Sequence, residues 1–213
     1  MKWYPSANLK GHTGSINCVD VVKTESDPDV IHIVSSSADG QIIVWTRRAN
    51  GKWELKAKQS AGKACIYECI SVAILNNTLI VAGGGLDNNI DVYAIPNITN
   101  PSMNETNTSE LNEEEEKDVK QDMYTVLKLC TFEGHLDWVR SLDFHNINDK
   151  EILLASGSQD GYIRTWKVIH MDTDENDSDS GKDTNVIDID GVFYKYNIEA
   201  LLVGHSVSIV INE

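Results

Sequence analysis

The chain has 213 residues, of which 41% are apolar and 24% charged, and its formal net charge is −15 at neutral pH. This length and apolar share are enough for one domain with a sizeable core. The sequence contains neither a signal-like apolar N-terminus nor an apolar run as long as a membrane helix requires, so we expect no membrane association.

The negative charge is concentrated in two segments. Residues 99–122 hold eight acidic and two basic residues, and residues 172–190 hold eight acidic and one basic residue. These segments supply 13 of the 15 net negative charges, so the remainder is almost neutral. Because that remainder has no basic stripe with interleaved aromatic residues, we expect no direct binding of nucleic acid.

The first repeat unit spans residues 10–60 and opens with Gly-His at 11–12. Apolar alternation predicts four short strands, at residues 15–22, 30–35, 42–46 and 53–59. An Asp-Gly pair at 39–40 is a strong hairpin signal. Residues 1–9 are predicted to hold the end of an outer strand from a preceding unit.

The second unit, residues 61–132, is degenerate. Its strands are predicted at residues 69–75, 78–82, 90–94 and 124–131. Lys63, Gly83 and Tyr93 stand where the other units have Gly-His, Ser and Trp, and only Asp87 is retained. We expect apolar packing to hold this unit without a polar junction. Residues 97–122 are too polar to offset their ordering entropy and are predicted to be a disordered acidic insert.

The third unit, residues 133–203, opens with Gly-His at 134–135 and carries a second predicted disordered acidic insert at 170–190. A further Gly-His at 204–205 predicts that residues 204–213 begin another unit. Two interpretations of the acidic inserts stay open. They either tether a basic partner or are tolerated surface insertions.

Two units share a polar quartet: a His after Gly, a Ser, an Asp four residues after that Ser, and a Trp six residues after the Asp. The members are His12, Ser35, Asp39 and Trp45 in the first unit and His135, Ser156, Asp160 and Trp166 in the third. An imidazole can bond a hydroxyl and a carboxylate at once, and an indole N–H adds another donor. We expect both quartets to be structural junctions between strands and not catalytic.

This repeated spacing resembles that of the WD-repeat family, whose members fold as β-propellers. The resemblance implies an all-β, partial propeller, with three four-stranded blades and the first strand of a fourth. It also implies that the third and fifth residues after each His face the mouth of the ring, where the family holds its partners. The candidate partner-binding residues are therefore Ser15, Asn17, Trp138 and Arg140. Trp and Arg are common in interface hot spots, although Trp138 could equally be a rim aromatic without a partner.

The sequence lacks a phosphate-binding loop, a nucleophile elbow and metal-spaced Cys or His pairs. We therefore expect no enzymatic activity, no cofactor, no metal and no small-molecule ligand. The four cysteines have neither zinc-site spacing nor a secretory context, and we interpret them as reduced structural thiols of an intracellular protein. They are Cys18, Cys65, Cys69 and Cys130.

The order of the units is similar to that of the Elongator subunit 2 family. The similarity lies in five short sequence motifs. They are the Ser-Ala-Asp-Gly turn before Trp45, the degenerate Ala-Gly-Gly-Gly-Leu-Asp motif at residues 82–87, the segments 134–140 and 154–166, and Leu-Leu-Val-Gly-His at residues 201–205. It implies a scaffold that contacts the largest and catalytic Elongator subunits and supports modification of the transfer RNA wobble uridine. Older descriptions add histone acetylation and transcript elongation, and the implied location is cytoplasmic and nuclear.

Two other classes of function remain open. A peptide-reading WD-repeat adaptor of the chromatin or ubiquitin-ligase type would need a closed ring with a central pocket. A propeller enzyme would need ionisable residues that converge near the ring axis with shifted pKa values.

Overall fold

A computed structural model describes residues 7–24, 28–61, 66–98, 123–171, 186–189 and 192–203. Within these ranges the regular secondary structure consists of antiparallel β-sheets. Among the described residues, no helix has the length and apolar character that crossing a bilayer requires. The third Gly-His pair and the start of a further unit that it predicts lie outside the described residues, as do residues 1–6 and Cys65.

The first sheet is a four-stranded meander in the order β1-β2-β3-β4. Its strands are β1 (Ile16–Lys23), β2 (Ile31–Ser37), β3 (Gln41–Arg47) and β4 (Trp53–Ser60). The turn between β2 and β3 contains Gly40 at φ 74°, a left-handed conformation that glycine adopts without strain. All four strands lie within a residue or two of their predicted positions.

The second sheet repeats this order with β5 (Tyr67–Leu75), β6 (Thr78–Gly85), β7 (Ile90–Ile95) and β8 (Leu127–Phe132). The hairpin between β5 and β6 turns at Asn76 and Asn77, both at positive φ, as a two-residue turn of this type requires. The acidic insert was predicted to begin at residue 97, yet Ile98 is only 2% exposed and packs in the core. The predicted insert therefore began too early and included one core residue, because Ile98 stands among polar residues in the sequence.

The third sheet has five strands in the order β12-β13-β11-β10-β9. They are β9 (Val139–Asn148), β10 (Glu151–Ser158), β11 (Tyr162–Met171), β12 (Val186–Ile189) and β13 (Val192–Val203). The four strands of the predicted blade are present as β9, β10, β11 and β13, and β12, which lies in the segment assigned to the second insert, is an additional strand that pairs with β13. Val186, Ile187 and Ile189 give this short stretch the β-branched composition of a strand despite the surrounding acids.

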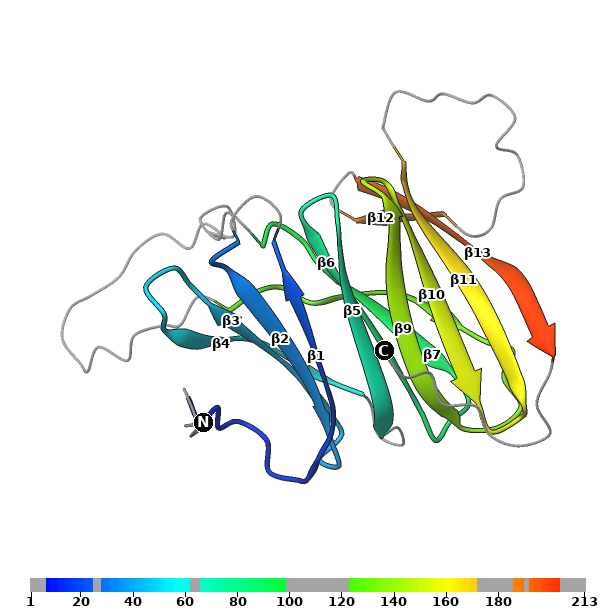
Figure 1. The fold of residues 1–213 in the computed structure, drawn as a ribbon, viewed down its shortest axis with the longest axis horizontal. Coiled ribbons are helices and arrows are strands. Elements are labelled where there is room, and N and C mark those ends of the chain that lie inside the picture. Colours follow the sequence, from blue (N-terminus) through cyan, green and yellow to red (C-terminus); the bar gives the residue numbers. More distant parts are fainter. Residues whose placement is uncertain are drawn as a thin grey trace, which may run out of the picture.

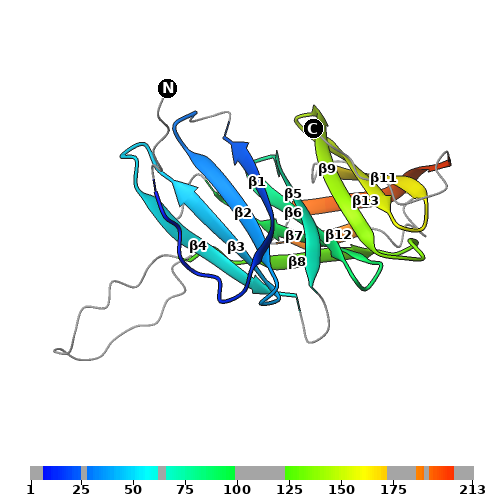
Figure 2. The ribbon, with the colours of Figure 1, turned by 60° about the horizontal axis from the view of Figure 1, so that its bottom comes forward.

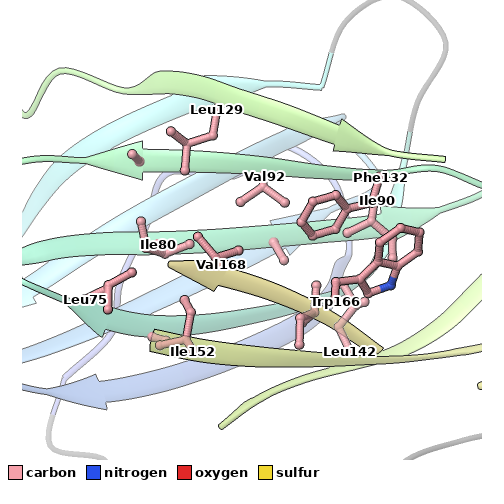
Figure 3. Close-up of a cluster of buried hydrophobic side chains, with 14 of the residues drawn as sticks. Leu75, Ile80, Ile90, Val92, Leu129, Phe132, Leu142, Ile152, Trp166 and Val168 are labelled. Atoms are coloured by element: carbon pink, nitrogen blue, oxygen red, sulfur yellow. The ribbon is translucent and has the colours of Figure 1, made fainter. Parts of the chain in front are cut away.

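The three sheets lie side by side, and β1, β5 and β9, the first strands of the three sheets, are neighbours (Figure 1, Figure 2). One buried cluster fills the space between the first and second sheets, and a second cluster fills the space between the second and third (Figure 3). In the second cluster Phe132 stacks on Trp166 with ring centroids 4.6 Å apart. This packing fixes the ends of the strands, where the polar quartets lie.

Candidate functional site

The quartet of the first sheet is joined by hydrogen bonds. His12 Nδ1 donates to Asp39 Oδ2 over 3.0 Å, and His12 Nε2 lies 2.9 Å from Ser35 Oγ. Trp45 Nε1 donates to the same hydroxyl over 3.2 Å. One serine hydroxyl thus links an imidazole to the indole of the third strand.

Asp39 is held by more than His12. It also accepts the backbone N–H groups of Thr13 over 2.8 Å and Gln41 over 3.0 Å. Burial alone would raise the pKa of Asp39, but the bonds from Thr13, His12 and Gln41 outweigh it and lower that pKa to about 2. The carboxylate is therefore kept charged as the acceptor of a tight turn.

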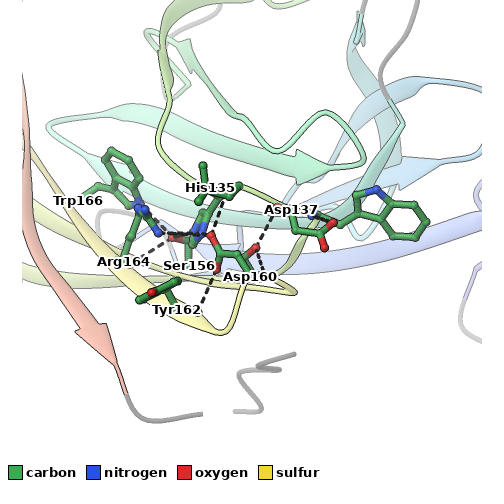
Figure 4. Close-up of polar contacts among 10 residues, drawn as sticks. His135, Asp137, Ser156, Asp160, Tyr162, Arg164 and Trp166 are labelled. Carbon is green, nitrogen blue, oxygen red and sulfur yellow. Dashed lines mark hydrogen bonds and ion pairs between the residues drawn. The ribbon is translucent and has the colours of Figure 1, made fainter. Parts of the chain in front are cut away.

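The third sheet repeats this geometry (Figure 4). His135 Nδ1 donates to Asp160 Oδ2 over 2.9 Å, and His135 Nε2 lies 2.8 Å from Ser156 Oγ. Trp166 Nε1 donates to Ser156 Oγ over 3.0 Å. Burial lowers the pKa of His135, while the bond to Asp160 opposes that effect.

Asp160 also accepts the N–H groups of Leu136 and Tyr162, each over 2.9 Å. Arg164 Nη1 lies 3.5 Å from the same carboxylate, an ion pair that the first sheet lacks because Ile43 occupies the matching position. The structure therefore brings all four members of each predicted quartet together.

The Ser-His-Asp part of this arrangement has the distances of a hydrolase triad. Ser156, however, is 0% exposed, and its hydroxyl is already engaged by His135 and by the indole N–H of Trp166. A nucleophilic serine needs an open path to the substrate and an oxyanion site beside it. The buried quartet instead satisfies its own polar groups and can join strands.

The second sheet does have a polar junction, which corrects the expectation of apolar packing alone. Tyr67 Oη donates to Asp91 Oδ2 over 2.7 Å and lies 2.8 Å from Tyr93 Oη. Thr131 Oγ1 and Lys128 Nζ each lie 2.7 Å from Asp91 Oδ1. Burial raises the pKa of Tyr67, and its bonds to Tyr93 and Asp91 raise it further. This second junction consists of Tyr67, Asp91 and Tyr93, with Thr131 and Lys128 at its edge.

The junction of Tyr67, Asp91 and Tyr93 explains why a glycine, Gly83, stands where the other two sheets have the quartet serine. A Cβ built on Gly83 would lie 2.9 Å from the Tyr67 ring, so the tyrosine fills the space that a serine would need. Asp87, the one retained quartet residue, is exposed, and within the described part of the chain it accepts only the N–H of Asn89, over 3.3 Å. The signal that could have revealed the junction is the second acidic residue, Asp91, in an otherwise apolar strand.

We predict that Tyr67→Phe lowers the free energy of unfolding by about 1 kcal/mol, because it removes one buried hydroxyl from Asp91 and Tyr93. Asp87→Ala is the matched control and is expected to change it by less than about 0.5 kcal/mol. Urea unfolding of both variants measures the difference. A larger loss for Asp87→Ala than for Tyr67→Phe would contradict the assignment.

The four candidate partner-binding residues fall into two groups. The guanidinium of Arg140 lies 4.8 Å from the ring centroid of Trp138, which is 39% exposed, and its Nη2 donates to Gln159 Oε1 over 3.1 Å. Ser15 and Asn17 are exposed, and Asn17 Nδ2 donates to the carbonyl of Tyr67 on β5. The structure thus pairs Trp138 with Arg140 but directs the Asn17 amide towards the neighbouring sheet.

The described cysteines carry free thiols, namely Cys18, Cys69 and Cys130. Burial raises the pKa of Cys69, and it raises the pKa of Cys130 to about 12. A thiol with such a pKa is a poor nucleophile at neutral pH. Over the residues that the structure describes, no group of three or more His, Cys, Asp or Glu side chains is arranged to hold a metal ion.

Comparisons with known proteins agree with this geometry. The family model described as "WD domain, G-beta repeat" matches residues 3–46 and 127–167. A solved structure titled "Structure of U3-55K" superimposes with a TM-score of 0.50 at 20% identity, covering 94% of this chain and 42% of that one. That likeness concerns the fold, and it confirms the predicted all-β propeller architecture.

Three curated relatives carry the name Elongator complex protein 2. The protein from Dictyostelium discoideum is 31% identical over 179 residues, which is 75% of this chain and 17% of the relative. Those from Drosophila melanogaster and Homo sapiens are 24% and 26% identical, and each alignment covers 94% of this chain but 25% and 22% of the relative. The chain thus spans a quarter or less of the length of these relatives. It contains WD repeats folded as β-propeller blades and is similar to Elongator complex protein 2 over most of its length.

Proposed function

We propose that the chain acts as a non-catalytic WD-repeat scaffold in an Elongator complex. The observation that carries this proposal is the similarity to proteins named Elongator complex protein 2 from several organisms, over 75 to 94% of the chain. The geometry supports it, because the Ser156 hydroxyl, which has the distances of a triad serine to His135, is buried and is already engaged in hydrogen bonds. Its partners are the largest and catalytic subunits of that complex.

In this proposal the chain supports modification of the transfer RNA wobble uridine through protein contacts alone. Transcript elongation and histone acetylation are further roles that the Elongator family has been given. The scaffold works in both cytoplasm and nucleus. The exposed Trp138, whose ring centroid lies 4.8 Å from the Arg140 guanidinium, is the contact residue that we assign, since an aromatic beside a guanidinium suits an interface hot spot.

Purification of the tagged protein from its own cells tests the proposal. We expect the largest and catalytic Elongator subunits in the eluate, and a loss of about tenfold or more of both with Trp138→Ala, which removes a hot-spot side chain. Leu136→Ala, at a neighbouring exposed apolar residue, is the matched control and is expected to retain both subunits.

An eluate that lacks both subunits would contradict the scaffold proposal. Histones or ubiquitin-ligase components in their place would favour the alternative, a peptide-reading WD-repeat adaptor. Retention of both subunits by Trp138→Ala would leave the scaffold standing but remove Trp138 from its interface.

A further inference from the structure

The turn between β3 and β4 contains the one Asn-Gly pair of the chain, Asn50 and Gly51 (Figure 1). Two backbone hydrogen bonds close this turn. The N–H of Gly51 donates to the carbonyl of Arg48 over 2.8 Å, and the N–H of Arg48 donates to the carbonyl of Lys52 over 3.1 Å. Gly51 has a φ of 78°, which glycine adopts without strain. The geometry of the hairpin therefore favours this pair of residues at its tip.

The Asn50 side chain is exposed and is folded back on the backbone of the turn. Its Oδ1 accepts the N–H of Lys52 over 2.9 Å. This bond draws electrons from the side-chain carbonyl and directs a donor at the oxygen that becomes negative when Cγ is attacked. The amide of Asn50 is thus a polarised electrophile next to the nitrogen of the following residue.

An asparagine followed by glycine can lose ammonia through attack by the next backbone nitrogen. The N–H of Gly51 gives its proton to water, its nitrogen bonds to Asn50 Cγ, and the side-chain amide nitrogen leaves as ammonia. Water then opens the cyclic imide. Cleavage of the new Cγ–N bond gives aspartate, whereas cleavage of the original backbone C–N bond gives isoaspartate, in which the main chain runs through the side chain. The reaction consumes only water.

A guanidinium lies close to the attacking nitrogen. Arg47 Nη2 lies 3.9 Å from the position that a Cβ on Gly51 would take. Positive charge there favours loss of the Gly51 amide proton and stabilises the negative charge on Oδ1 during the attack. The bond from Gly51 to the Arg48 carbonyl opposes the reaction, so the turn must open briefly. Exposed turns are the segments of a fold that open most easily.

Other positions in the described chain lack one of these features. Four further asparagines have positive φ, but the residues that follow them carry side chains that hinder ring closure, namely Asn76, Asn77, Asn88 and Asn97. Asp39 and Asp160 precede glycine, yet each is held as a carboxylate by backbone N–H donors. An ionised carboxylate resists attack by a nucleophile. Asn50 alone combines a following glycine with a polarised amide.

We propose that Asn50 is a deamidation site and that it reacts before any other asparagine of the folded chain. The aspartate product keeps an acceptor for the Lys52 N–H and places a negative charge among Arg47, Arg48 and Lys52. The isoaspartate product lengthens the main chain by a methylene group, so the two bonds that close the turn no longer fit. Modification therefore yields one form with a charge-compensated hairpin and one with a loosened turn. This proposal does not depend on the Elongator assignment.

Peptide mass spectrometry of the purified 213-residue chain, incubated at neutral pH and sampled over time, tests the proposal. We expect conversion of Asn50 ahead of every other asparagine, and two products of equal mass that chromatography separates. Asn50→Gln needs a larger ring for the same attack, so its peptide is expected to stay unchanged over this period. An Asn50 that stays intact, or another asparagine that reacts first, would overturn the proposal.

Two variants of Lys52 test the role of its backbone N–H. Lys52→Pro removes the donor to Oδ1 and is expected to convert Asn50 about tenfold more slowly than Lys52→Ala, a smaller effect than loss of an oxyanion donor has in an enzyme. Lys52→Ala is the matched control, because it loses the same ammonium group but keeps the N–H. Equal rates, or faster conversion in Lys52→Pro, would mean that opening of the turn and not polarisation by this N–H controls the reaction.

Discussion

Replacing Asp160 with alanine is expected to lower the free energy of unfolding by about 1 to 3 kcal/mol. The change removes the acceptor of His135 Nδ1 and of the N–H groups of Leu136 and Tyr162, all within 2.9 Å. It also leaves Arg164 without its carboxylate partner. Because these donors lose their partner in a largely buried turn, their desolvation is no longer compensated. Urea unfolding at neutral pH measures the loss.

Asp87→Ala is the matched control for Asp160→Ala, since Asp87 has the same place in the degenerate sheet but is exposed. It is expected to leave the stability within about 0.5 kcal/mol of the unchanged protein. Equal losses for the two variants would mean that the carboxylate acts through its turn position and not through the quartet.

Acidification from pH 6.5 to pH 4 is expected to cost about 3 kcal/mol of stability through His32 alone. His32 is fully buried, its Nδ1 lies 2.9 Å from Thr46 Oγ1, and its Nε2 has no hydrogen-bond partner among the residues that the structure describes. Burial, and secondarily the nearby charge of Arg48, lower the pKa of His32 from 6.5 to about 4. The unfolded chain therefore binds the proton first, so this stability is complete above pH 6.5 and is lost as the pH falls towards 4.

Urea unfolding between pH 7 and pH 4.5 measures this slope, which is about 1.4 kcal/mol per pH unit for one proton. His32→Gln is expected to flatten the slope by up to that amount. His145→Gln, which removes an exposed imidazole from β9, is the matched control and should keep the slope of the unchanged protein. The interpretation of His32 fails if both substitutions leave the slope unchanged.

The sequence contained enough information to place both quartets, because each depends on a short phrase with fixed spacing. The Ser-to-Trp spacing spans one hairpin, so Ser156 and Trp166 become diagonal neighbours on the same face of the sheet once β10 and β11 pair, with Arg164 opposite Ser156. The blade order was also readable, since strand alternation survives even in the degenerate unit. Periodicity of two and turn residues were sufficient for these elements.

The junction of the second sheet could not be predicted in the same way. Tyr67 lies 24 residues before Asp91 and has no fixed spacing to Tyr93 in the repeat pattern. The Tyr67 side chain enters the junction from the start of β5, and only a glycine at position 83 leaves room for its ring. Such a compensation becomes visible only when the three strands are in register.

Contacts between sheets were likewise beyond the sequence pattern. Asp20 and Ser71 are unremarkable polar residues in half-buried strands, and their bonds to Val72 and Phe144 span 52 and 73 residues. β12 was missed for a different reason, because its few apolar residues lie in a strongly acidic segment. The bonds of Asp20 and Ser71 were not predictable because their partners are distant along the chain, and β12 was not predictable because its segment has an acidic composition.

A double-mutant cycle on His135 and Asp160 tests most directly whether the quartet is a structural junction. Urea unfolding of His135→Ala, Asp160→Ala and the double variant gives their coupling free energy. If the four residues act as one junction, the coupling is about 1 to 2 kcal/mol, because each single change already breaks the shared bonds. Losses that add to within about 0.3 kcal/mol would contradict this account of the WD-repeat scaffold.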